Sequence, residues 1–246
     1  MHDGFSGPDD KAGTLDLGGL ADLLEGWSAA GFAAKRRFEA AARRYIRLPQ
    51  PGEGPLDYLL PEVVWQELLN RVPDPEGWLM ALSAATGVYF FPSREWPVKF
   101  MRFLGLLRVR RLLEAGAGRG YLTAALAPLT ETAGIDFKAV DKGEGDFQVP
   151  LPVHHRVESG DVFQVVHEFQ PEVVVYAWPP PGQSLAPLLQ MPCLRSLIVI
   201  GERGGGAVGA REDWQNLAHR FSPVLSCWGR GRTGPDRHQV TIFLRQ

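Results

Sequence analysis

The sequence predicts an α/β fold in which a mostly parallel sheet of seven strands, with an antiparallel strand at one edge, follows an all-α segment. Two observations predict it. Up to about residue 107 the apolar residues recur at helical spacing, and from residue 108 short β-rich apolar runs alternate with stretches of helical spacing. Apolar strands separated by crossovers are typical of a parallel sheet that is covered on both faces.

Several stretches of helical spacing precede the sheet and define a predicted N-terminal helical cap, or substrate domain, over residues 14–107. They are residues 20–48, 61–72, 74–87 and 93–107. Pro61 and Pro75 suit first helical positions, and Asp74 and Ser93 suit N-cap positions. The run LPQPGEGP at residues 48–55 is predicted to be a turn or linker.

Seven apolar runs are the predicted strands of a second domain, residues 108–246. They are residues 110–116, 136–141, 155–161, 172–178, 196–202, 222–228 and 239–246. The last two are separated by the turn-rich run at 229–238, which predicts a hairpin and places an antiparallel strand at one edge. The connection at 142–153 is short for a crossover helix.

Composition and charge exclude several classes of protein. The chain of 246 residues is 45% hydrophobic, enough for a sizeable core, and residues 1–13 are predicted to be a disordered tail. A formal charge of -2 without long runs of one sign makes nucleic acid an unpromising partner. We expect no membrane partner, because no apolar run approaches the roughly 20 residues of a membrane helix. Two cysteines are too few for a disulfide framework, and without a leader pattern we expect a cytoplasmic protein.

The stretch LLEAGAGRGYLTAAL at residues 112–126 places three glycines between a predicted strand and a predicted helix. Gly116 and Gly118 would let a ligand approach main-chain N–H groups, and Gly120 opens a helix whose N-terminus favours negative charge. Their G-x-G-x-G spacing differs from the G-x-G-x-x-G dinucleotide fingerprint, which argues against NAD and FAD. Glu114 suits a ligand that carries an ammonium group. A tight strand-to-helix turn without a ligand is the alternative.

The run EAGAGRG resembles the E/D-x-G-x-G-x-G motif of class I S-adenosylmethionine-dependent methyltransferases, whose domain is Rossmann-like. The resemblance implies that Glu114 and the three glycines hold the methionine and ribose parts of S-adenosylmethionine. It implies that Asp141, about 20 residues further on at the end of the second strand, binds the ribose hydroxyls. It also implies that Asp161, in SGD at 159–161, lies near the adenine amino group.

The run VVVYAWPPPGQS at residues 173–184 ends the fourth strand, at the edge where open α/β sheets bind ligands. Methyltransferases that act on amino groups often carry N/D-P-P-Y/F there. In this chain Trp178 occupies the polar position, Pro179 and Pro180 follow, and Pro181 replaces the aromatic residue. Trp178, Pro179 and Pro180 are predicted to bind substrate. The absence of the polar residue and of the aromatic residue weakens the case for methylation of an amine. A stiff connection capped by a core tryptophan is the alternative.

Glu202 ends the fifth predicted strand on the same rim as Trp178, so it is our candidate catalytic residue, able to bind or deprotonate an acceptor. An exposed acid that opens a glycine loop is the alternative. The combination of W-P-P with I-G-E-x-x-G-G also resembles a group of uncharacterised methyltransferase-like proteins, which implies no substrate.

Two further groups of residues are weaker candidates. The side chains of His154 and His155 are predicted to diverge, and we predict no metal site. Arg230, Arg232 and Arg237 make the last hairpin basic, either to meet a phosphate or an RNA backbone or as solvated loop charge.

Two classes of function follow. The first is an S-adenosylmethionine-dependent methyltransferase that acts on an N, O or S nucleophile of a small molecule, with a protein or nucleic-acid amine as the variant substrate. In it the N-terminal helices form part of the acceptor pocket. The second is a non-catalytic methyltransferase-like scaffold or partner subunit, favoured by Trp178 and by the short connection at 142–153.

Overall fold

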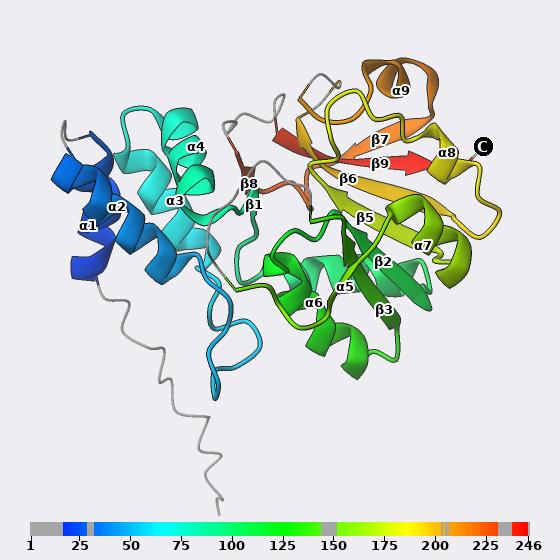
Figure 1. Cartoon of the computed structure of the whole chain (residues 1–246), viewed down its shortest axis with the longest axis horizontal. Coiled ribbons are helices and arrows are strands. Elements are labelled where there is room, and N and C mark those ends of the chain that lie inside the picture. Colours follow the sequence, from blue (N-terminus) through cyan, green and yellow to red (C-terminus); the bar gives the residue numbers. More distant parts are fainter. Residues whose placement is uncertain are drawn as a thin grey trace, which may run out of the picture.

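The structure, a computed structural model, describes most of the chain. The described residues are 17–28, 32–143, 152–202, 204, 207–230 and 238–245. The predicted tail at 1–13 lies outside them, as do Arg232 and Arg237. Figure 1 shows the first helices on one side of the molecule and the large sheet on the other, with the short strands β1 (Phe90–Phe91) and β8 (Trp228–Gly229) between them.

Helices dominate the segment before the sheet, as predicted. They are α1 (Leu17–Ser28), α2 (Phe32–Tyr45), α3 (Glu62–Arg71), α4 (Pro75–Thr86) and α5 (Trp96–Leu106). The stretch predicted as continuous over 20–48 forms two helices, α1 and α2, and residues 29–31 lie outside the described residues. The predicted turn at 48–55 is confirmed, since it contains neither helix nor strand.

Pro75 begins α4 as predicted, but Pro61 is the N-cap of α3 rather than its first residue. The two predicted N-caps also have different outcomes. Asp74 caps α4, and its side chain accepts a hydrogen bond from the N–H of Gly77 at 3.0 Å. The prediction for Ser93 is wrong, because α5 begins at Trp96 with Glu95 at the N-cap. With Ser93 as cap, Pro97 would be the fourth helical residue, whose N–H makes the first intrahelical bond and which proline lacks. Starting at Trp96 places Pro97 in the first turn, where that N–H is not needed.

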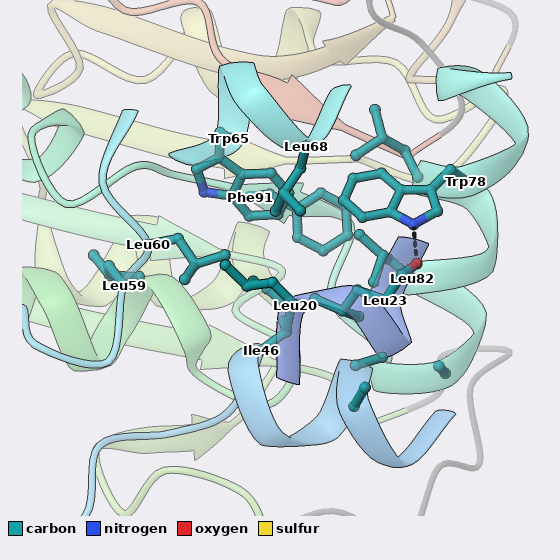
Figure 2. Packing of buried hydrophobic residues seen from close by; sticks show 14 of the residues in the cluster. Leu20, Leu23, Ile46, Leu59, Leu60, Trp65, Leu68, Trp78, Leu82 and Phe91 are labelled. Carbon is teal, nitrogen blue, oxygen red and sulfur yellow. Dashed lines mark hydrogen bonds between the residues drawn. The ribbon is translucent and has the colours of Figure 1, made fainter. Parts of the chain in front are cut away.

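A hydrophobic cluster fills the space between the N-terminal helices (Figure 2). The ring of Trp65 lies 5.4 Å from that of Phe91. Trp78 is fully buried, and its indole N–H donates to the carbonyl of Leu23 at 2.9 Å, which joins α4 to α1. The cluster also includes Tyr121, the first residue after the glycine loop. The N-terminal helices are therefore packed directly against the start of the helix that follows the glycine loop.

The large sheet confirms the predicted α/β class with seven, mostly parallel strands. Its strands are β2 (Arg111–Ala115), β3 (Asp136–Asp141), β4 (Val157–Ser159), β5 (Val173–Ala177), β6 (Ser196–Glu202), β7 (His219–Ser222) and β9 (His238–Leu244). They lie in the order β4-β3-β2-β5-β6-β9-β7, and the first five are parallel to one another. Ala115, at the end of β2, is level with Val140 of β3 and Tyr176 of β5.

Helices cover both faces of the sheet. The remaining ones are α6 (Tyr121–Thr132), α7 (Val162–Phe169), α8 (Ala186–Leu189) and α9 (Arg211–Asn216). Leu113 packs with α7, α8 and α9, whereas its neighbour Leu112 packs with α5 and α6 on the opposite face. Helix α5 lies before the predicted domain boundary between residues 107 and 108, yet it packs into this core of the sheet. The boundary therefore stays a prediction.

The antiparallel pairing predicted at one edge of the sheet is confirmed. β9 is antiparallel to both neighbours and lies between β6 and β7, so β7 is the edge strand. The bounds predicted for the first strand of this pair, 222–228, are wrong, because β7 ends at Ser222. Pro223 follows, and proline cannot donate to a strand ladder. In β9 Val240 and Phe243 are fully buried, which suits an interior strand, whereas the short β7 suits an edge.

The connection between β3 and β4 is partly described. Its described residues, 142–143 and 152–156, contain no helix, and residues 144–151 lie outside the described part of the chain. Among the helices that the structure describes, each is too short or too polar to cross a membrane.

Candidate functional site

The glycine loop follows β2 and leads into α6, as predicted. Gly116, Gly118 and Gly120 all have positive φ, at 62°, 54° and 80°. A Cβ on Gly116 would lie 2.6 Å from Cε2 of Tyr176, and one on Gly120 would lie 2.5 Å from Cβ of His154. A Cβ on Gly118 would meet nothing within 4 Å. Packing therefore requires two of the glycines, while the third faces open space.

This loop lies where the winding of the sheet reverses. From β2 the chain adds β3 and β4 on one side, and β5 and β6 on the other. In open α/β sheets ligands bind outside the carboxyl ends of the strands at this reversal. The chain departs from the parallel dinucleotide-binding order at β9, which is antiparallel and inserted beside β6.

Glu114 lies in β2, just beneath the glycine loop. It is 2% exposed, and its Oε2 accepts a hydrogen bond from the hydroxyl of Thr123 in α6 at 2.8 Å. Burial raises the pKa of Glu114 to about 8; the Thr123 hydrogen bond opposes the rise, and the negative charge of Asp141 adds to it. The side chain is therefore placed to respond to a cation that approaches the loop.

Asp141 ends β3 and holds the glycine loop. Its Oδ2 accepts from the N–H of Gly118 at 2.8 Å, and its Oδ1 accepts from the N–H of Gly143 at 2.7 Å. A carboxylate has about four acceptor positions, so further donors can still bind it.

Asp161 is the N-cap of α7. Its Oδ1 accepts from the N–H groups of Phe163 at 2.8 Å and Gln164 at 3.3 Å, and its Oδ2 pairs with Nζ of Lys142 at 2.5 Å. The hydrogen bond from Lys142 and those from the two N–H groups lower the pKa of Asp161. The carboxylate is thus ionised and fixed at the edge of the sheet, one strand beyond Asp141.

The W-P-P run leaves the end of β5 in a strained conformation. Trp178 has φ 54°, in the left-handed region that bulky residues avoid. Its N–H donates to the carbonyl of Ile200 in β6 at 2.8 Å. Pro179 is buried, and its carbonyl accepts from the N–H of Gly209 at 3.1 Å, whereas Pro180 is exposed. The segment is therefore tied to β6 and to the loop before α9.

Glu202 is half-buried and ends β6, two residues beyond Ile200, on the rim that carries Trp178. The ring of Tyr89, in the segment before β1, meets the indole of Trp178 edge to face at 5.9 Å. Sequence reasoning missed Tyr89, because it lies 89 positions from Trp178 by number and in a different predicted domain; no local pattern marks it.

The histidine pair differs from its prediction. The rings of His154 and His155 lie 4.4 Å apart rather than diverging. They lie where an extended segment enters a turn, which brings adjacent side chains together. Within the described ranges there is no group of three or more His, Cys, Asp or Glu that could hold a metal ion.

No protein-family model matches the sequence, and no curated protein matches it either. Solved structures of other proteins do match this chain. The CurJ carbon methyltransferase shares 14% identity over 92% of this chain and 90% of its own, with a TM-score of 0.41. Human N-acetylserotonin methyltransferase, solved with S-adenosylmethionine, shares 12% over 86% of this chain and 66% of its own, at 0.38. The CMeT domain of the citrinin polyketide synthase shares 14% over 73% of this chain, at 0.40, and the chain spans 59% of its length.

At identities of 12–14% and TM-scores below 0.5, these likenesses assign neither a family nor an activity to the chain. We therefore argue activity and substrate from this chain's own residues.

Tyr58 makes a contact that sequence reasoning missed. Its hydroxyl donates to the carbonyl of Tyr121 at 2.6 Å, and the two rings meet edge to face at 5.3 Å. Burial raises the pKa of Tyr58, and the nearby Tyr121 and Glu114 raise it further. Tyr58 thus anchors the N-terminal segment to the first residue of α6, directly behind the glycine loop.

Tyr58→Phe should lower the free energy of unfolding by about 1 kcal/mol, because a buried hydrogen bond is lost while the ring packing stays. Urea unfolding measures the change. Tyr176→Phe is the control, since that hydroxyl donates only weakly to Gln183 at 3.4 Å and should contribute less. Equal losses in the two variants would contradict an anchoring role for the Tyr58 hydroxyl.

The raised pKa of Glu114 predicts a pH-dependent stability. Folded Glu114 keeps its proton up to about pH 8, whereas the unfolded chain loses it near the ordinary value of 4.5. Between these values the folded state binds more protons, so stability falls as pH rises, by up to about 1.4 kcal/mol per pH unit. Glu114→Gln removes this dependence, so the variant should gain on the wild type between pH 5 and 8. Urea unfolding across that range measures it; parallel profiles would mean that Glu114 is already ionised.

Proposed function

We propose that the chain is an S-adenosylmethionine-dependent methyltransferase that transfers a methyl group to an N, O or S nucleophile of a small molecule. One observation carries the proposal: the structure gathers the glycine loop, Glu114, Asp141 and Asp161 at the reversal point of the sheet. The resemblance in sequence implied these residues separately, and they come from three strands in chain order.

The residues fit the cofactor by the chemistry of their donors and acceptors. S-adenosylmethionine carries an ammonium group, two ribose hydroxyls and an adenine amino group, all of which donate hydrogen bonds. The site offers one acidic side chain for each of these groups: Glu114 for the ammonium group, Asp141 for the ribose hydroxyls and Asp161 for the adenine amino group. Gly118 adds a main chain that a ligand can approach, since a Cβ there would meet nothing within 4 Å.

The chain's residues mainly bind and orient. When bound, the cofactor would supply a methyl group activated by a sulfonium to the acceptor's lone pair, and the neutral thioether would be the leaving group. Alignment of these atoms and exclusion of water then contribute most of the rate. Glu202, on the rim beside Trp178, is the proposed base for an acceptor that is protonated at working pH.

Calorimetric titration tests the cofactor assignment. We expect saturable binding of S-adenosylmethionine and S-adenosylhomocysteine, and none of NAD. The ammonium group should lower the pKa of Glu114 on binding, so a proton is released near pH 7 and the measured heat should vary with the ionisation enthalpy of the buffer. Absence of binding for both sulfur ligands would overturn the proposal.

A non-catalytic methyltransferase-like scaffold or partner subunit is the second candidate. Two observations favour it: Trp178 stands where amine methyltransferases carry a polar acceptor residue, and the described part of the β3–β4 connection contains no helix. Tight binding of S-adenosylmethionine without formation of S-adenosylhomocysteine from any acceptor would support it. Methylation of a protein or nucleic-acid amine is the third candidate, and the missing polar residue argues against it.

A further inference from the structure

Three side chains from distant segments meet at the end of β5. Tyr89 precedes β1, Trp178 follows β5, and Arg230 follows β8. The guanidinium of Arg230 lies 4.8 Å from the centre of the Tyr89 ring, and the ring of Tyr89 meets the indole of Trp178 at 5.9 Å. The main-chain N–H of Arg230 also donates to the carbonyl of Tyr89 at 2.8 Å. The β1–β8 ribbon thus holds an arginine and a tyrosine against the W-P-P segment.

Trp178 is held in this position at an energetic cost. A tryptophan at φ 54° is a backbone outlier, and such strain is concentrated at binding and catalytic sites. The residue is tied to β6 in this conformation, since its main-chain N–H donates to the carbonyl of Ile200 at 2.8 Å. Its indole lies beside Gly201 of the same strand, where an added Cβ would be 3.6 Å from the ring.

The cluster lies beside the site proposed for the methyl donor. Trp178 is two residues beyond Tyr176, whose ring stands against Gly116 of the glycine loop. All three members of the cluster are half-buried, so each has both a packed and an accessible side. An acceptor resting on the indole would therefore lie next to the cofactor loop.

We propose that Tyr89, Trp178 and Arg230 form the acceptor subsite and that it binds a small aromatic carboxylate, with the ring against Trp178 and the carboxylate on Arg230. This inference rests on the proposed function and names its substrate class. An indole face favours a planar ring, and the fork of guanidinium donors matches a carboxylate in a bidentate pair. The formal charge of -2 without a long basic run argues against a polyanion.

Calorimetry of the full chain, saturated with S-adenosylhomocysteine, tests the subsite with 4-hydroxybenzoate and its neutral analogue 4-hydroxybenzamide. We expect the benzoate to bind about tenfold or more tightly than the benzamide. Arg230→Gln should remove that preference without weakening the benzamide, and Trp178→Leu should weaken both ligands. Arg71→Gln is the matched control: its side chain is exposed on α3 and paired with Glu67, and it should change neither affinity.

The outcomes separate this inference from the proposed function. If S-adenosylhomocysteine binds but the benzoate does not, or binds equally to the Arg230→Gln variant, the subsite is overturned and the cofactor site stands. Preferential binding of uridine monophosphate over the benzoate would also overturn it. If S-adenosylhomocysteine does not bind, the proposed function fails, and binding of the benzoate alone, lost in Arg230→Gln, would still uphold the subsite. Thermal unfolding of each variant confirms that it folds.

Discussion

Asp141→Ala should weaken binding of S-adenosylhomocysteine by about 100-fold or more. The carboxylate is proposed to accept from the ribose hydroxyls, and two charge-assisted hydrogen bonds of about 1.5 kcal/mol each correspond to that factor. The same carboxylate holds the N–H groups of Gly118 and Gly143, so the variant also loses the tie between the glycine loop and β3. Calorimetric titration at constant pH and salt measures the affinity.

Asp136→Ala is the control for this prediction. Asp136 begins β3, the strand that Asp141 ends, and its side chain is exposed. The substitution removes the same group at the opposite end of the strand, so affinity should stay within about twofold and stability should change little. An Asp141→Ala protein that unfolds like wild type and binds the cofactor equally well would refute the ribose assignment.

The fold class followed from local patterns because each parallel strand is a short apolar run with a turn on either side. β3 and β6 have the predicted bounds, 136–141 and 196–202. The order of the last two strands of the sheet could not be predicted in this way. Whether β7 or β9 occupies the edge depends on which of them buries more apolar surface against α9 and β6, and spacing along the chain carries no such information.

The candidate site likewise has residues that could be predicted from the sequence and residues that could not. The glycine loop and its acids form a local motif with fixed spacing, so they could be proposed from sequence. Tyr58 and Tyr89 could not, because their partners Tyr121 and Trp178 are far along the chain. The strain at Trp178 was equally hidden, since a bulky residue with positive φ is not expected from the residue types of the W-P-P run.

Gly120→Ala should destabilise the protein by about 3 kcal/mol, the sum of left-handed strain and overpacking. Gly120 has φ 80°, and a Cβ would lie 2.5 Å from Cβ of His154 and 2.8 Å from Cγ2 of Val157. Neither neighbour is the free end of a long side chain, so the backbone around β4 would have to shift. Urea unfolding measures the loss, and a change below about 1 kcal/mol would show that β4 and its approach yield easily.

Gly118→Ala separates the fold of this loop from its proposed ligand. Gly118 has φ 54° and open space around its Cβ position, so the variant should lose only about 1 kcal/mol of stability from strain. Gly134→Ala is the matched control, because Gly134 has φ 67° and equally open space but lies after α6, away from the loop. Both variants should lose similar stability, while only Gly118→Ala should weaken S-adenosylhomocysteine, because the new methyl group occupies the space that the cofactor needs. Equal affinities for the two variants would place the cofactor elsewhere and leave the G-x-G-x-G run as a turn that packing alone requires.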